Sequence, residues 1–120
     1  MTFAILFPGQ GSQSVGMLSA WAALSPAVRD TLAEAETIVG PELLTLMADG
    51  PSCRLDRTEF TQPAMLVADV ALWRAWLAAG GPRPVAVAGH SLGEYAALVA
   101  AEVLTFPEAL RLVQERALAM

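Results

Sequence analysis

The pentapeptide Gly-His-Ser-Leu-Gly at residues 89–93 constrains the fold of this chain more than any other feature. An apolar run at 85–88 precedes it, and an apolar stretch follows from Leu92 onward. A serine in a G-x-S-x-G frame is typical of a sharp strand-to-helix turn, where small residues on either side let the strand and the helix approach closely. The pattern predicts that Ser91 is a nucleophile, with the next backbone N–H and the helix N-terminus facing a developing oxyanion.

A serine nucleophile needs a base, and His90 is the only histidine of the chain. Neighbouring residues around a tight turn point in different directions, so we expect His90 to pack or to form hydrogen bonds at the turn. Glu94 lies on the same helix as Ser91, but a carboxylate with an ordinary pKa of about 4 is a poor base for a hydroxyl. The sequence therefore shows a nucleophile without a convincing base.

A chain of 120 residues is too short for two ordinary domains, so one domain is expected. The alternation of predicted strands and helices indicates an α/β fold. The apolar runs at 3–7 and 85–88 suit buried parallel strands. Thr61 is expected to cap a helix that is apolar nearly all round and therefore buried, and Thr105 to Glu108 fits a capping box. Helices are predicted over 26–39, 41–48, 61–79, 92–103 and from 105 to the end of the sequence, with a polar loop over 51–60.

Composition narrows the possible partners and the compartment. The formal net charge is −5, lysine is absent and the arginines are dispersed, so no basic patch favours nucleic acid or an anionic membrane. The single cysteine, Cys53, rules out a disulfide within the chain and fits a reducing, cytoplasmic compartment. The N-terminal segment lacks the basic region of a signal peptide. No metal site is expected.

Two further features allow more than one interpretation. The stretch FPGQGSQ at 7–13 follows a predicted strand, and its backbone either completes an oxyanion hole or forms an ordinary glycine-rich turn. It lacks the lysine of a Walker A loop. Arg116, on the last helix, can fold back toward the serine and bind a carboxylate bidentately, although an exposed surface arginine is favoured from the residues alone.

Four stretches together resemble the N-terminal part of the malonyl-CoA:acyl carrier protein transacylases, acyltransferases of fatty-acid synthesis with relatives in polyketide synthases. They are FPGQGSQSVGML (7–18), TQPAM (61–65), GHSLGEYAALVAA (89–101) and RLVQERALAM (111–120). The resemblance implies that 1–120 is an incomplete, α/β-hydrolase-like large subdomain with short parallel strands flanked by helices, and that the chain stops inside a helix. The family's ferredoxin-like small subdomain and its base, a histidine, would follow position 120.

The resemblance also implies a role for each matching residue. Ser91 would accept the malonyl group of malonyl-CoA as an ester, and the backbone N–H groups of Gln10 and Leu92 would form the oxyanion hole. Arg116 would pair with the free carboxylate of malonate, with Gln62 lining the pocket. The malonyl group would then pass to the phosphopantetheine thiol of acyl carrier protein, with no bound cofactor.

Two other functions remain open at this point. One is a serine esterase or thioesterase of the α/β-hydrolase type, which shares the serine turn but has no need of Arg116. The other is a non-catalytic fragment that lacks the base histidine, so that the 120 residues alone would be inactive or very weak. In that case two short strands with open edges and an apolar helix are expected to be partly uncovered.

Overall fold

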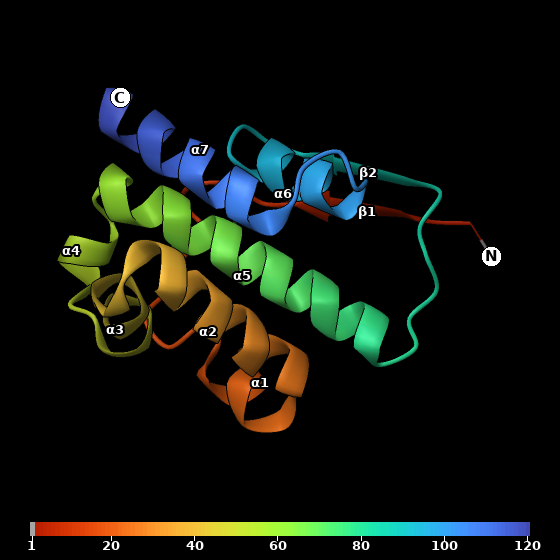
Figure 1. The fold of residues 1–120 in the computed structure, drawn as a ribbon, viewed down its shortest axis with the longest axis horizontal. Helices are drawn as coiled ribbons and strands as arrows, with labels where there is room; N and C mark the ends of the chain where they lie inside the picture. Colours follow the sequence, from red (N-terminus) through yellow and green to blue (C-terminus); the bar gives the residue numbers. More distant parts are fainter. Residues whose placement is uncertain (1) are drawn as a thin grey trace.

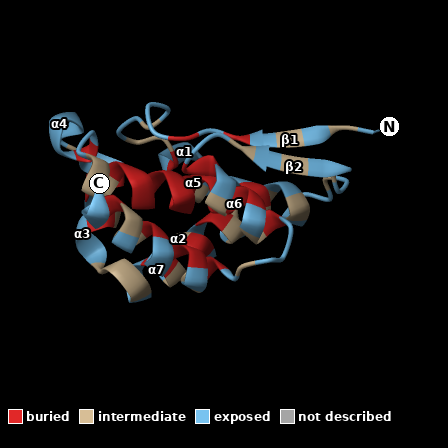
Figure 2. Ribbon diagram, turned by 90° about the horizontal axis from the view of Figure 1, so that it is seen from above, coloured by how far each residue is buried: buried red, intermediate tan, exposed pale blue. Residues whose placement is uncertain are grey.

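The structure is a computed structural model that describes residues 2–120. Strands β1 (Ala4–Phe7) and β2 (Ala86–Gly89) pair in parallel, with Phe7 opposite Gly89. The helices are α1 (Ser19–Leu24), α2 (Pro26–Val39), α3 (Pro41–Asp49), α4 (Ser52–Leu55), α5 (Thr58–Ala78), α6 (Gly93–Ala100) and α7 (Phe106–Ala119). The predicted α/β architecture, short parallel strands flanked by helices, is confirmed, and both strands point toward the end of the molecule where α5 begins and α7 ends (Figures 1 and 2).

Helix α5 forms the centre of the core and contacts α2, α3, α6 and α7 (Figure 1). Every residue from Thr61 to Ala71 is buried, which confirms the burial predicted from its all-round apolar sequence. Figure 2 shows buried residues concentrated on α5 and on the helix faces turned toward it, while much of the sheet is exposed. Leu6 of β1 is 76% exposed. The expectation of partly uncovered apolar surface therefore holds for the strands. On the helix it holds only near the C-terminal end, where Leu72 and Trp76 are exposed.

The predicted loop over 51–60 is wrong, because this stretch holds α4 and the first residues of α5. Thr61 is not the N-cap of α5, because it is the fourth residue of the helix and is fully buried. Its hydroxyl shares one proton between the carbonyl oxygens of Leu55 and Arg57. Leu55 is 1% exposed and belongs to the core. One buried leucine thus holds a mostly polar segment against the core. The mostly polar sequence around Leu55 gave no sign that this residue is buried.

Other element ends differ less from the prediction. Helix α1 was not predicted, and α6 ends at Ala100 rather than at 103 because the N–H groups of Val103 and Leu104 bond back to the Leu98 carbonyl. The capping box of α7 is confirmed. The Thr105 hydroxyl accepts a hydrogen bond from the Glu108 N–H at 3.2 Å, and the Glu108 carboxylate accepts one from the Thr105 N–H at 3.1 Å.

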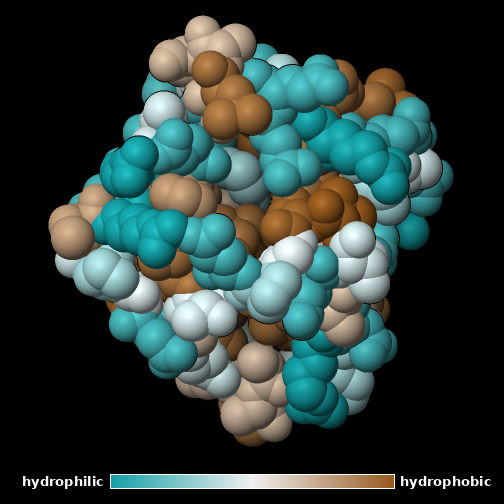
Figure 3. All heavy atoms as spheres, turned by 60° about the vertical axis from the view of Figure 1, so that its left-hand side comes forward, coloured by the Kyte–Doolittle hydropathy of each residue, from teal (hydrophilic) through white to brown (hydrophobic). Residues whose placement is uncertain are grey.

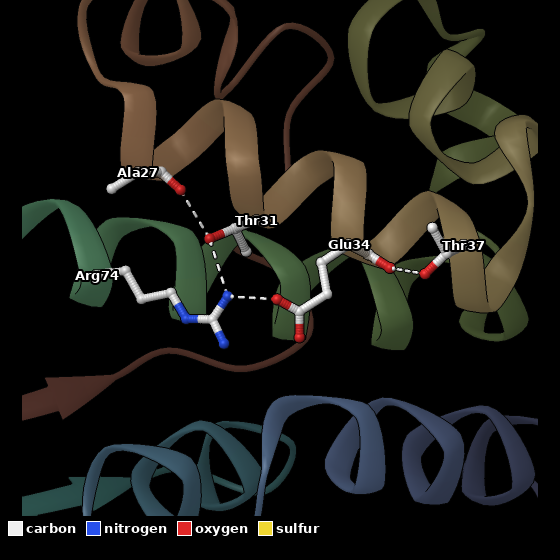
Figure 4. Close-up of polar contacts among 5 residues, drawn as sticks. All are labelled: Ala27, Thr31, Glu34, Thr37 and Arg74. Atoms are coloured by element: carbon white, nitrogen blue, oxygen red, sulfur yellow. Dashed lines mark hydrogen bonds and ion pairs between the residues drawn. The ribbon is translucent and has the colours of Figure 1, made fainter.

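Arg74 of α5 contacts both α2 and α7, and Figure 4 shows its hydrogen bonds to α2. Its guanidinium donates to the Glu34 carboxylate at 3.1 Å and to the Thr31 hydroxyl at 3.3 Å, both on α2, and lies 5.0 Å from the ring centroid of Phe106 on α7. The fully buried Thr31 also donates its hydroxyl proton to the Ala27 carbonyl at 2.8 Å. The polar atoms at this helix junction are therefore paired, as burial requires.

The surface carries no single dominant apolar area on the end where α4 and the C-terminus lie. Figure 3 shows apolar residues there broken into separate patches by hydrophilic ones. Among residues 2–120, no helix combines the length and the apolarity needed to cross a bilayer. Cys53 is exposed.

Asp69 is a buried carboxylic acid in the middle of α5. It is 5% exposed, and its Oδ2 atom has no hydrogen-bond partner among the described residues. It lines a small cavity of apolar character between α5 and β1, together with Phe7 and Trp73. Because ionisation in such a place is costly, burial raises the pKa of Asp69 to about 7.

Asp69→Asn is expected to change the pH dependence of stability. Between the unfolded pKa of 3.8 and the folded pKa of about 7, the folded state keeps a proton that the unfolded state releases. The free energy of unfolding of the wild type therefore falls as the pH rises through this window and stays low above it. An asparagine cannot ionise, so the variant does not lose this stability. Its free energy of unfolding relative to that of the wild type should rise by roughly 2 to 4 kcal/mol between pH 4 and pH 8. Urea unfolding at several pH values measures this, and Asp30→Asn, on the exposed surface of α2, is the control. An equal pH dependence in the two variants would contradict the assignment.

Candidate active site

The turn between β2 and α6 is built on two glycines that leave no space for a side chain. A Cβ atom on Gly89 would overlap the backbone of Gly93, and a Cβ atom on Gly93 would overlap the carbonyl of Phe7. The strand and the helix therefore approach each other as closely as their backbones allow. Ser91 lies at the tip of this turn with φ at 54°, a left-handed conformation that is unfavourable for a residue other than glycine.

The hydroxyl of Ser91 is exposed and bonded to an arginine. The Arg116 guanidinium donates to the Ser91 Oγ atom at 3.1 Å. Within residues 2–120, no hydrogen bond joins the side chain of Ser91 to that of His90 or Glu94. His90 instead accepts the Gly93 N–H through its backbone carbonyl at 3.0 Å, and its side chain is exposed. Neither candidate base that the sequence offered is placed on the hydroxyl.

Arg116 also contacts Gln62, whose side chain is fully buried in α5. The guanidinium donates to Gln62 Oε1 and lies 5.9 Å from the ring centroid of Tyr95. The helix hairpin of α6 and α7 folds the arginine back toward the serine turn. The structure thus brings together Ser91 of the turn before α6, Gln62 of α5 and Arg116 of α7.

The charge of Arg116 is not balanced by a nearby carboxylate. Arg54, Arg57 and Arg74 each lie within 4.0 Å of a glutamate, but in the described part of the chain no such partner faces Arg116. A half-buried guanidinium without an acidic partner leaves a positive charge beside Ser91. This charge suits an anionic group of a ligand, and a carboxylate matches the guanidinium geometry.

The loop after β1, residues 8–13, lies against the serine turn and is called here the Gln10 loop. A Cβ atom on Gly9 would come within 2.6 Å of the His90 carbonyl oxygen and 3.7 Å of the Leu92 nitrogen. Among residues 2–120, neither Gln10 nor Leu92 donates its N–H to a backbone carbonyl outside the regular elements. Both amides are therefore available to bind an oxygen atom, as an oxyanion hole requires.

Sequence reasoning missed the residues that hold the Gln10 loop. The Thr58 hydroxyl donates to Gln10 Oε1 at 3.0 Å and accepts a hydrogen bond from Gln62 Nε2 at 2.9 Å. Gln13 accepts the Gly11 N–H at 2.7 Å and donates to the Asp56 carboxylate at 2.9 Å. Thr58 and Gln62 are four residues apart, a spacing that places them on one helix face. The spacing of Thr58 and Gln62 has this meaning only if both residues lie in one helix, and the predicted helix began after Thr58.

Metal ligands are not gathered in the site. In the part of the chain that the structure describes, no three histidine, cysteine, aspartate or glutamate side chains could hold a metal ion together. The groups joined by hydrogen bonds at the site are the Ser91 hydroxyl, the Arg116 guanidinium and the Gln62 amide, with the Gln10 loop beside them. A hydroxyl can act as a nucleophile and a guanidinium can bind a carboxylate.

Residues 4–120 match the model of the acyl transferase domain family. The chain belongs to this family.

Similar proteins confirm the resemblance that the sequence motifs indicated. Over 114 residues the chain is 55% identical to the malonyl CoA-acyl carrier protein transacylase of Salmonella typhimurium, covering 95% of this chain and 37% of that protein. A crystal structure of an acyl-carrier-protein S-malonyltransferase from Burkholderia pseudomallei matches with a TM-score of 0.95 and 57% identity, covering 100% of this chain and 39% of that one. A malonyl-transacylase in complex with a type II polyketide synthase acyl-carrier protein matches with a TM-score of 0.92 and 50% identity, over 98% of this chain and 38% of that one. The chain thus spans well under half the length of these relatives.

Substitutions of Ser91 test whether the turn holds this residue under strain. Ser91→Ala keeps a side chain in the left-handed conformation, whereas Ser91→Gly relieves its cost. Ser91→Gly should therefore be more stable than Ser91→Ala by about 1 kcal/mol. Thermal unfolding of the two variants measures the difference. Ser52→Gly and Ser52→Ala, at the first residue of α4, form the control pair and should show the opposite order. An equal or lower stability of Ser91→Gly would show that the turn is unstrained.

Proposed function

We propose that this chain carries the nucleophile, the oxyanion donors and the carboxylate-binding arginine of a malonyl-CoA:acyl carrier protein transacylase of fatty-acid synthesis. The observation that carries the proposal is the Arg116 guanidinium, 3.1 Å from the Ser91 hydroxyl and without a carboxylate partner among the described residues. A fixed positive charge beside a nucleophile favours an acyl group that ends in a carboxylate. The names of the relatives support the same reaction.

The first half of the reaction forms a malonyl ester. Ser91 loses its proton to a base, and its oxygen attacks the thioester carbonyl carbon of malonyl-CoA. The N–H groups of Gln10 and Leu92 bind the resulting oxyanion, while Arg116 holds the free carboxylate of the malonyl group. The carbon–sulfur bond then breaks, and coenzyme A leaves as the thiol after taking up the proton.

The second half transfers the malonyl group to the carrier protein. The phosphopantetheine thiol of acyl carrier protein gives up its proton and attacks the ester carbonyl, and Ser91 recovers a proton as the ester bond breaks. The solved transacylase complex with an acyl-carrier protein supports this choice of partner. The residues of the site hold and polarise the acyl group themselves, so we propose that no bound cofactor takes part.

We propose that the base lies outside residues 1–120 and is a histidine, as the family resemblance implies. The geometry supports this, since the Ser91 hydroxyl bonds to Arg116 and to neither His90 nor Glu94. Residues 1–120 would then be part of the large subdomain of the family, in keeping with the greater length of the relatives. The acidic chain with one exposed cysteine supports a cytoplasmic location.

Arg116→Ala tests the choice of acyl group without relying on the base. Binding of malonyl-CoA should weaken roughly 10-fold to 100-fold, because a charged pair is lost, while binding of acetyl-CoA stays unchanged. Isothermal titration with each thioester measures this. Arg111→Ala, exposed on the same helix, is the matched control and should bind both as the wild type does. If the protein is a simple esterase, Arg116→Ala should bind both thioesters as the wild type does. If Arg116→Ala binds both thioesters equally more weakly, Arg116 contacts coenzyme A rather than the malonyl carboxylate.

A further inference from the structure

Thr58 lies between the two sides of the site and contacts both. Its hydroxyl donates to Gln10 Oε1 in the Gln10 loop at 3.0 Å and accepts from Gln62 Nε2 at 2.9 Å. Gln62 in turn accepts from Arg116, which donates to Ser91. One hydroxyl thus joins the loop that carries an oxyanion donor to the pair that carries the carboxylate anchor.

The protons in this chain of hydrogen bonds can be assigned from the donors alone. A guanidinium has donors only, so the atom of Gln62 that faces Arg116 must be Oε1. The NH₂ group of Gln62 must then point the other way, toward an acceptor. Thr58 supplies that acceptor, and its own single proton goes to Gln10 Oε1. With the amide of Gln62 reversed, two donor groups would face each other beside Ser91.

Burial makes the orientation of Gln62 depend on Thr58. The Gln62 side chain is fully buried, so water cannot readily replace a lost partner, and an unpaired buried amide is costly. Gln62 Nε2 also approaches the Met120 sulfur at 3.2 Å, but a thioether is only a weak acceptor. Thr58 is therefore the strong acceptor that the described residues offer to this amide.

The segment just before α5 holds the Gln10 loop at a second point. Asp56 accepts a hydrogen bond from Gln13, two residues before Thr58. The loop is thus fastened at both Gln10 and Gln13 to one short segment of the chain. This double attachment limits the freedom of the Gln10 backbone next to the serine turn.

We propose that Thr58 is a positioning residue, which orients the Gln62 amide so that Arg116 is held for the acyl carboxylate and which fixes the Gln10 loop. The inference rests on the proposed function for its substrate, since Arg116 is the carboxylate anchor there. The orientation of Gln10 and Gln62 by the Thr58 hydroxyl does not depend on which substrate binds. Thr58 itself touches no reacting atom.

Thr58→Val removes the hydroxyl at nearly constant shape, and Thr58→Ser restores it. Thr45→Val, on the exposed face of α3, is the matched control because the Thr45 hydroxyl bonds only to a carbonyl of its own helix at 3.1 Å. In Thr58→Val, malonyl-CoA binding should weaken roughly 10-fold while acetyl-CoA binding is unchanged, so the ratio between the two falls. In Thr58→Ser and Thr45→Val, the ratio should stay as in the wild type. If Thr58→Val weakened the binding of both thioesters equally, the effect would be a general loss of stability and would contradict the positioning role.

A second measurement separates this inference from the proposed function. Nitrogen-15 NMR of the free protein reports the side-chain NH₂ of Gln62 and the backbone N–H of Gln10. Both signals should shift in Thr58→Val and stay in place in Thr58→Ser and Thr45→Val. Unshifted signals in a folded Thr58→Val protein would overturn the inference. If the signals shift but the wild type does not prefer malonyl-CoA, the positioning role stands and the proposed substrate is wrong.

Discussion

The close contact between β2 and α6 is the constraint on which the site depends. Gly89 and Gly93 meet backbone to backbone, and Gly93 also meets the end of β1 at Phe7. This packing forces the intervening turn outward and places Ser91 in a left-handed conformation at the carboxyl edge of the sheet. Any side chain at either glycine would push the strand and the helix apart. The exposed hydroxyl is therefore a consequence of packing rather than of a flexible loop.

Helix α5 forms one side of the site and is held in place by its burial in the core. The helix is buried from Thr61 to Ala71, so the Gln62 side chain that bonds to Arg116 of α7 is held inside the core. The cost of burying an amide is offset because both ends of the Gln62 side chain are hydrogen-bonded. Tertiary packing thus converts an exposed serine and a single arginine into a site of defined geometry.

Much of this arrangement could be predicted from the sequence, because local patterns encode it. The apolar runs gave the strands, the all-round apolar stretch gave the buried helix, and Thr105 with Glu108 gave the cap of α7. The serine turn was visible in five residues. What could not be read locally was the start of α5 at Thr58 and the burial of Leu55 just before it, because burial depends on contacts with distant parts of the chain.

The same limit applied to the site. The residues alone allowed Arg116 to fold back toward the serine but favoured an exposed surface arginine, and the family resemblance decided for the first. The structure brings its guanidinium to 3.1 Å from the Ser91 hydroxyl. Thr58 escaped notice because it fell in a stretch expected to be a loop, so its four-residue spacing from Gln62 carried no meaning there. Contacts between distant segments decide such residues, and no local pattern reports them.

The most direct test of the account is to find where a malonyl group attaches. The folded protein is mixed with malonyl-CoA, with imidazole added as an external base, quenched in acid, and analysed by intact mass and peptide mapping. We expect one malonyl ester on Ser91, none on Ser91→Ala, and much less acylation of Ser91 when acetyl-CoA replaces malonyl-CoA. A malonyl group on another residue, such as the exposed Cys53, or a folded protein that stays unmodified at Ser91, would contradict it.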